Sequence, residues 1–214
     1  MIKLLKTIAT FSKTRQLSFI KLTIFYLLAT ITSMMISSFF SSYFDLQNPN
    51  DFSNTSSRTL YENIAILLVF VPIMEEFGFR GGLTFKPYYF QLSLSILFAF
   101  VLNYVGNIEL FSLNTLLLVS FSFVILMLLI PEKKLDFFKK NRLVIIYTSI
   151  FLFGIMHLPL LGIMHIWAVP ILVLPQIIVG FFLSFYRIEY GLRMSIIMHT
   201  LVNLPFAVLL VIAH

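Results

Sequence analysis

Seven largely apolar stretches, each about 20 residues long, constrain the fold of this chain more than any other feature. A helix of that length crosses the hydrocarbon core of a bilayer and satisfies its own backbone hydrogen bonds there. The 214 residues are 59% hydrophobic and only 11% charged, unlike an ordinary soluble domain. We therefore predict an all-α, polytopic transmembrane helical bundle of about seven spans, forming a single domain over residues 1–214. The predicted spans are 22–40, 63–83, 88–106, 111–130, 143–161, 165–186 and 195–213.

The distribution of basic residues supports this topology. With seven spans and a cytoplasmic N-terminus, every basic residue except Arg58 falls on the cytoplasmic side, as the positive-inside rule predicts. The net charge of +6 then marks topology and attraction to anionic lipid, so we expect no nucleic-acid partner. The polar segment 45–57 becomes an external loop and the charged segment 131–142 a cytoplasmic loop. The first span lacks a small-residue cleavage site, so we expect a retained anchor.

Several polar residues lie inside the predicted spans or at their edges. A charge at the bilayer centre costs at least about 2.5 kcal/mol, so such residues usually face the protein interior or a wet cavity and mark a functional site. The chain has no cysteine, which leaves carboxylate, imidazole, amide and hydroxyl groups for any chemistry. The residues in question are Glu75, Glu76, Arg80, Asn103, His157, His165, Gln176, His199 and Asn203.

The first group of these residues is in the stretch PIMEEFGFRGG. Glu76 and Arg80 are four residues apart, so they share a helix face and can form an ion pair that lowers the cost of burying both. Glu75 points about 100° away around the helix and lacks that partner. Apolar surroundings increase the proton affinity of an unpaired carboxyl group, which suits a general base. Glu75 is therefore the better candidate base.

The second group is in the stretch FGIMHLPLLGIMH. Phe153 and His157 share a helix face, while Gly154 and Pro159 permit a close helix approach and a local break. A single histidine in such a stretch is often a hydrogen-bonded packing residue. We expect no catalytic role for His165, which lies near the outer interface.

The third group pairs His199 with Asn203, again four residues apart. This spacing directs an imidazole and a carboxamide to one point, where they could stabilise an oxyanion, although both residue types also join membrane helices by hydrogen bonds. On the predicted spans His157 lies about 21 Å from the cytoplasmic boundary, whereas Glu75 and His199 lie within about 10 Å of it. We therefore expect tilt, a break near Pro159 or an early start of the fifth span to bring the groups together.

The three groups together resemble the ordered motifs of the CPBP family of intramembrane glutamic endopeptidases. This family includes the type II CAAX prenyl proteases and the bacterial Abi proteins. The resemblance covers residues 62–205, which we interpret as the catalytic core, and residues 180–203 are similar to the last two core helices of the family. The matching motifs are E-E-x-x-x-R at Glu75, Glu76 and Arg80, F-x-x-x-H at Phe153 and His157, and H-x-x-x-N at His199 and Asn203.

The resemblance implies an endopeptidase that cuts a membrane-proximal or lipid-modified peptide or protein. Glu75 and His157 would activate the attacking water, and His199 with Asn203 would stabilise the oxyanion. The remaining motif residues, Glu76, Arg80 and Phe153, would support the site. Because the chain is rich in Phe, Ile, Lys and Asn, as bacterial members are, we expect a bacterial cytoplasmic membrane protein and not a CAAX substrate.

Other functions use the same residues. Glu75, His157 and His199 could bind a catalytic zinc, although no H-E-x-x-H helix is present, so we expect no cofactor. The same three residues could form the relay of a proton-coupled transporter. A non-catalytic bacteriocin-immunity scaffold is a further alternative. A serine protease is disfavoured because the chain contains no Gly-x-Ser-Gly turn. An aspartyl protease is disfavoured because the aspartates fall in predicted loops, at Asp45, Asp51 and Asp136.

Overall fold

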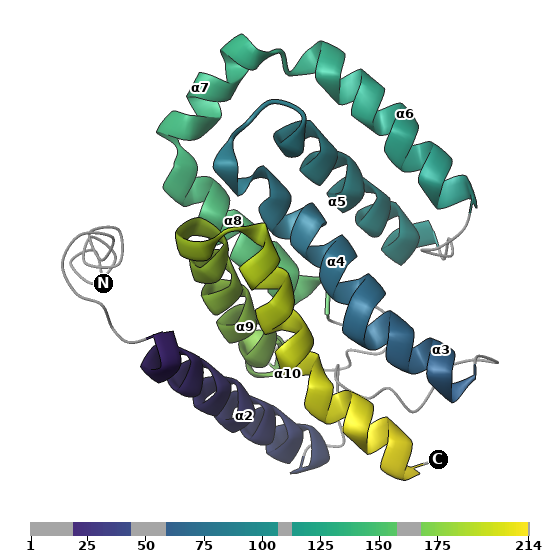
Figure 1. The fold of residues 1–214 in the computed structure, drawn as a ribbon, viewed down its shortest axis with the longest axis vertical. Helices are drawn as coiled ribbons and strands as arrows, with labels where there is room; N and C mark the ends of the chain where they lie inside the picture. The colour runs from purple at the N-terminus through teal and green to yellow at the C-terminus, as the bar shows by residue number, and fades with distance from the viewer. Residues whose placement is uncertain (1–18, 44–58, 107–112, 158–167, 214) are drawn as a thin grey trace.

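A computed structural model describes residues 19–43, 59–106, 113–157 and 168–213. This part of the chain is helical without strands, which confirms the predicted all-α class (Figure 1). The predicted loop 45–57, His165 and Pro159 lie outside the described residues. The helical elements are α2 (Phe19–Tyr43), α3 (Leu60–Ala65), η1 (Ile66–Phe70), α4 (Val71–Glu75), η2 (Glu76–Arg80), η3 (Gly81–Thr84), α5 (Tyr89–Gly106), α6 (Leu113–Leu129), α7 (Glu132–Lys140), α8 (Arg142–Ile155), α9 (Val169–Tyr190) and α10 (Leu192–Ala213).

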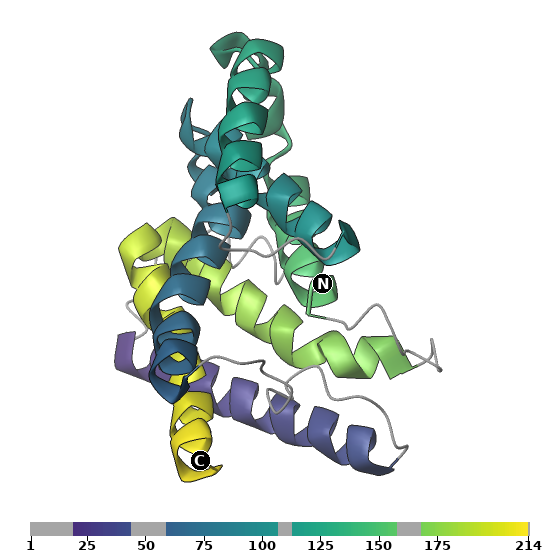
Figure 2. The same cartoon turned by 90° about the vertical axis from the view of Figure 1, so that its right-hand side faces the viewer.

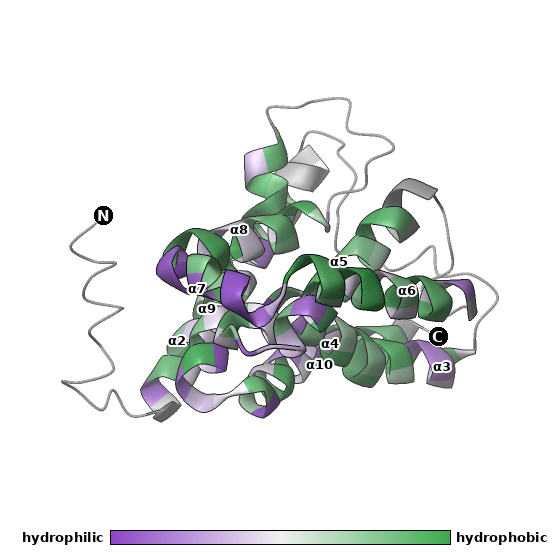
Figure 3. Ribbon diagram, turned by 90° about the horizontal axis from the view of Figure 1, so that it is seen from above, coloured by the Kyte–Doolittle hydropathy of each residue, from purple (hydrophilic) through white to green (hydrophobic). Residues whose placement is uncertain are grey.

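A helix lies at each of the seven predicted spans, and the helices consist mostly of hydrophobic residues (Figure 3). Many of their large hydrophobic side chains are exposed. Among the described residues, α9 and α10 are each long and apolar enough to cross a membrane. The helices α6 and α7 meet this requirement together but are bent by 87° at their junction. The helices α2, α5 and α8 contribute shorter apolar segments. The chain is thus a membrane-embedded helical bundle, and the number of seven spans stays a prediction.

The charged segment 131–142 differs from its prediction, because it contains the helix α7 and not only a loop. Leu135 on one face of α7 is fully buried, and the ring of Phe138 packs at a tilt against Phe90 of α5 with ring centroids 4.8 Å apart. Glu132 lies in the first turn and two lysines lie in the last turn, and charges in these positions stabilise a helix through its dipole. The predicted loop residue Asp136 is consequently helical and forms an exposed ion pair with Lys139. The charges of this segment indicate a loop, whereas the spacing of Leu135 and Phe138 gives it the apolar face of a helix.

The candidate catalytic glutamates lie on one long helix that runs without a break from α3 through α4 to η3 (Figure 1). Its N-terminus is closed by a capping box between Thr59 and Glu62. Two turns of this helix, η1 and η2, are π-helical. Wider turns of this type disturb the regular hydrogen bonding of the backbone and often occur at functional sites.

Side chains from neighbouring helices bond to the carbonyl groups of this long helix. Near η1, Thr200 and Asn203 of α10 donate to the carbonyl oxygens of Leu68 and Leu67 at 2.9 and 3.0 Å. The C-terminal end receives hydrogen bonds from three more helices. These run from Ser93 to Gly78, from Ser149 to Phe79 at 2.6 Å, and from Arg187 to Arg80 at 2.8 Å and to Gly81 at 3.1 Å. Backbone polar groups in a bilayer need such partners, so these contacts hold the helix end in place.

Two glycines let α8 and α9 approach each other closely. A Cβ atom on Gly154 would lie only 2.6 Å from a side-chain carbon of Ile177, which confirms the predicted close approach at this residue. A Cβ atom on Gly180 would lie 3.2 Å from the ring of Phe153 and 3.4 Å from the guanidinium of Arg80. Gly180 therefore makes room for two residues of the candidate site.

The helix α2 packs along α9, as both views of the fold show (Figures 1 and 2). The ring of Tyr26 is fully buried, with ring centroids 5.0 Å from Phe182 and 5.9 Å from Tyr186. The hydroxyl groups of Thr23 and Tyr186 are 3.1 Å apart. The predicted anchor is thus also part of the packed bundle.

Candidate active site

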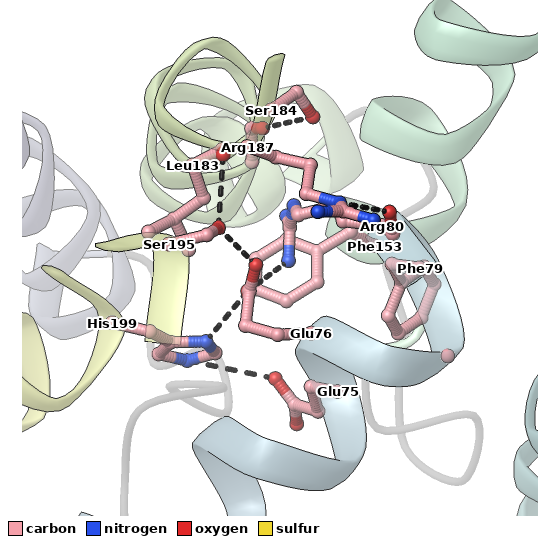
Figure 4. A network of polar contacts seen from close by, with 12 residues as sticks. Glu75, Glu76, Phe79, Arg80, Phe153, Leu183, Ser184, Arg187, Ser195 and His199 are labelled. Carbon is pink, nitrogen blue, oxygen red and sulfur yellow. Dashed lines mark hydrogen bonds and ion pairs between the residues drawn. The ribbon is translucent and has the colours of Figure 1, made fainter. Parts of the chain in front are cut away.

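The carboxyl group of Glu76 is the centre of a buried polar cluster (Figure 4). One carboxylate oxygen accepts hydrogen bonds from Arg80 and from Nδ1 of His199, the latter at 2.9 Å. The other oxygen accepts a hydrogen bond from the hydroxyl of Ser195. The structure thus contains the predicted ion pair between Glu76 and Arg80, and both side chains are fully buried.

The positive charge of Arg80 is compensated in two ways. Its guanidinium pairs with Glu76, and its Cζ atom lies 4.3 Å from the ring centroid of Phe153, which allows a cation–π interaction. Burying an ion pair is acceptable only where the geometry and further hydrogen bonds offset the loss of water. The bonds from Ser195 and His199 supply this compensation for the carboxylate, whereas Nε and Nη2 of Arg80 are buried without a hydrogen-bond partner among the described residues.

Glu75 lies beside the same imidazole but outside the ion pair. Its Oε2 atom is 3.6 Å from Nε2 of His199, longer than an ordinary hydrogen bond. This oxygen is buried without a hydrogen-bond partner in the described part of the chain, although the whole side chain is 17% exposed. The two ring nitrogens of His199 therefore face different glutamates, Nδ1 facing Glu76 and Nε2 facing Glu75 (Figure 4). Glu75 has the free bonding capacity that a water molecule would need.

His157 lies in a turn just beyond the end of α8. Its Nδ1 atom is 2.7 Å from the carbonyl oxygen of Phe153, so this nitrogen donates and Nε2 accepts in the neutral ring. The ring centroid of Phe153 is 4.7 Å from that of His157 and 5.9 Å from that of His199. The ring of Phe153 thus contacts both imidazoles. The described residues include no hydrogen bond or ion pair between His157 and Glu75.

Asn203 lies on the same side of α10 as His199 but already has a structural bond. One N–H of its carboxamide donates to Leu67 in η1, which leaves the second N–H for another acceptor. Both ring nitrogens of His199 face glutamates. The joint role of His199 and Asn203 at an oxyanion stays a prediction. It requires at least one of the two side chains to release a present contact.

Two residues of the cluster were missed by the sequence analysis. Ser195 is one helical turn before His199, so the same i, i+4 spacing could have identified it. Arg187 was interpreted only as a topology signal, yet it is buried and bonds to the end of the long helix. Of the other polar residues considered, Gln176 is buried in α9, and Asn103 lies within α5.

Replacing Ser195 with alanine is expected to lower the free energy of unfolding by about 1.5–3 kcal/mol, because a buried carboxylate loses a hydrogen bond. The midpoint of denaturant unfolding in detergent measures this effect. Ser184→Ala is the matched control, since the hydroxyl of Ser184 is also buried but bonds only to Gly180 in its own helix. Equal losses for the two variants would contradict a special role of Ser195.

The described residues contain no group of three histidine or acidic side chains arranged to hold a metal ion. Glu75 and His199 are neighbours, whereas no hydrogen bond or ion pair joins His157 to either of them in the described part of the chain. The predicted alternative of a zinc site would therefore require His157 to move toward Glu75.

A helical membrane bundle that gathers two carboxyl groups, a guanidinium and an imidazole in one cluster contains an intramembrane polar site of the kind that marks a function. The family model described as type II CAAX prenyl endopeptidase Rce1-like matches residues 57–205. The chain belongs to this family, and it is accordingly a CAAX-type intramembrane protease. Comparison with curated proteins and with solved structures gives no match. The family agrees with the resemblance found from the three motifs.

Proposed function

We propose that this protease is of the glutamic type and cuts a membrane-proximal or lipid-modified peptide by means of a water molecule activated by Glu75 and His157. The observation that carries the proposal is the buried oxygen of Glu75, which lacks a hydrogen-bond partner in the described part of the chain and faces His199. Glu76 has the opposite environment, with three donors on its carboxylate. The two adjacent glutamates therefore suit different tasks.

In the proposed reaction Glu75 takes a proton from water, and the hydroxide oxygen forms a bond with the peptide carbonyl carbon. His157 accepts a hydrogen bond from the same water through Nε2, since its Nδ1 is held by Phe153. The tetrahedral oxyanion accepts hydrogen bonds from Nε2 of His199, when this nitrogen carries a proton, and from the second N–H of Asn203. Glu75 then returns the proton to the leaving amine as the C–N bond breaks.

The remaining buried residues position these groups. The Arg80 guanidinium keeps Glu76 in place, and Glu76 fixes one nitrogen of His199. The aromatic ring of Phe153 contacts both imidazoles and packs against the guanidinium of Arg80. We further propose that the protein lies in a bacterial cytoplasmic membrane with its N-terminus inside.

We expect His157→Ala to reduce peptide cleavage by about 10²- to 10⁴-fold, because a group that activates water is lost. Asn203→Ala should retain more activity, since only one oxyanion donor is removed and His199 remains. Mass spectrometry of membrane peptides from cells that express each variant measures the cleavage products. Equal product from His157→Ala and the unaltered protein would refute the assigned role of His157.

A chelator distinguishes the glutamic mechanism from the zinc alternative. Glutamic-type cleavage should be unchanged in its presence, whereas activity that disappears and returns with added zinc would require a metal. Proton flux into liposomes without any cleavage product would instead support the transporter alternative.

A further inference from the structure

A cavity lies between η3, the start of α8 and the end of α9. Its volume is about 410 Å³, within the range of about 300–1,000 Å³ that is typical of small-molecule sites. None of the candidate catalytic residues lines it. Exposed residues such as Leu143, Tyr147 and Ile188 form part of its wall, so it opens at the molecular surface.

The lining of this cavity is amphipathic. Most of its wall is aliphatic or aromatic, including Ile146, Phe181 and Phe185. Arg142 and Glu189 add one positive and one negative charge, and both residues are exposed. The described residues provide no ion pair for either of them. The site therefore has a largely apolar interior together with two opposite charges that lack an ion pair among the described residues.

The position of the cavity matches a membrane–water boundary. Arg142 follows the basic last turn of α7, and Glu189 lies in the last turn of α9, just before Arg193 of α10. This end of the bundle thus has charged residues directly beside apolar helix surface, as does a bilayer between its headgroups and its hydrocarbon core.

We propose that this cavity binds a phospholipid with a zwitterionic, amine-bearing headgroup. The apolar wall holds part of an acyl chain, the guanidinium of Arg142 binds the lipid phosphate, and the carboxylate of Glu189 binds the headgroup ammonium. A purely anionic lipid would satisfy Arg142 but would place a negative headgroup near Glu189. Of these two classes of lipid, only the zwitterionic one pairs both charges.

A lipid in this cavity would also brace the end of the long helix. Ile150 in the cavity wall follows Ser149, which donates to the carbonyl of Phe79. Ser184 in the wall is about one turn before Arg187, which donates to Arg80 and Gly81. The occupant therefore contacts the same helices that hold the backbone behind the polar cluster.

Native mass spectrometry of the full chain tests this assignment with an equimolar mixture of phosphatidylethanolamine and phosphatidylglycerol. The protein should retain phosphatidylethanolamine in about fivefold excess, the factor expected from one exposed ion pair. Arg142→Ala should lose adducts of both lipids, because both contain a phosphate. Glu189→Ala should lose only the preference between them. The measurement does not depend on peptidase activity.

Two further variants complete the test. Ile146→Trp fills the cavity and should reduce binding of both lipids, whereas Arg193→Ala removes an exposed charge outside the cavity and should leave both unchanged. Equal retention of the two lipids by the unaltered protein would overturn the proposal. So would identical adducts in all variants, or retention of a peptide in place of lipid. Arg142 and Glu189 are exposed, so their replacement leaves the packed interior intact.

Discussion

Glu75→Gln is expected to reduce peptide-bond hydrolysis by about 10²- to 10⁴-fold, the range that removal of a general base produces. Glutamine has nearly the same shape as glutamate but cannot take a proton from water. The carboxyl oxygen of Glu75 is buried beside His199 without a hydrogen bond in the described part of the chain, so an isosteric amide fits the same space. The rate of product formation from an identified membrane peptide, followed by mass spectrometry, measures the loss.

The loss should be catalytic and not structural. Glu75 is outside the ion pair of Glu76 with Arg80, so the unfolding midpoint of Glu75→Gln should be close to that of the unaltered protein. Glu132→Gln is a suitable control, because Glu132 is exposed at the start of α7 and far along the chain from the motifs. If Glu75→Gln protein cuts the substrate at the unaltered rate, Glu75 is not the base.

Arg80→Met should produce the largest loss of stability, about 3–5 kcal/mol in the free energy of unfolding. The side chain of Glu76 is fully buried, and removal of its ion-pair partner leaves a buried carboxylate with only the hydrogen bonds from Ser195 and His199. The cation–π contact with Phe153 is lost as well. Denaturant unfolding in detergent, followed by circular dichroism, measures the change.

The double variant Arg80→Met with Glu76→Gln separates charge from packing. Because it removes both charges, it should recover part of the stability that Arg80→Met alone loses. Lys139→Met is the control for an exposed pair, since the ion pair of Lys139 with Asp136 is largely solvated and its loss should change stability by no more than about 0.5 kcal/mol. A similar small effect for Arg80→Met would show that its pair with Glu76 is not a structural centre.

Patterns among residues close together in the sequence predict the helices of this protein and the contacts between side chains four residues apart. Apolar stretches of about 20 residues identify the membrane helices, since a bilayer admits little else. The i, i+4 spacing of Glu76 and Arg80 predicts their ion pair, because the helix itself brings the two side chains together. The same rule places Phe153 against His157. In each case the two groups are four residues apart in the chain, so the local backbone brings them together whatever the rest of the fold.

Contacts between helices depend on the tertiary structure. Nothing in the spacing of α4 and α10 along the chain shows that His199 lies between Glu75 and Glu76, or that Ser195 donates to Glu76. From the sequence, Arg187 indicates only the cytoplasmic side of the membrane, whereas the packing of α9 buries it against the end of the long helix. Helix periodicity determines which side chains share a face, while the close packing of α8, α9 and α10 determines which faces meet. Only that packing decides which buried polar groups become partners.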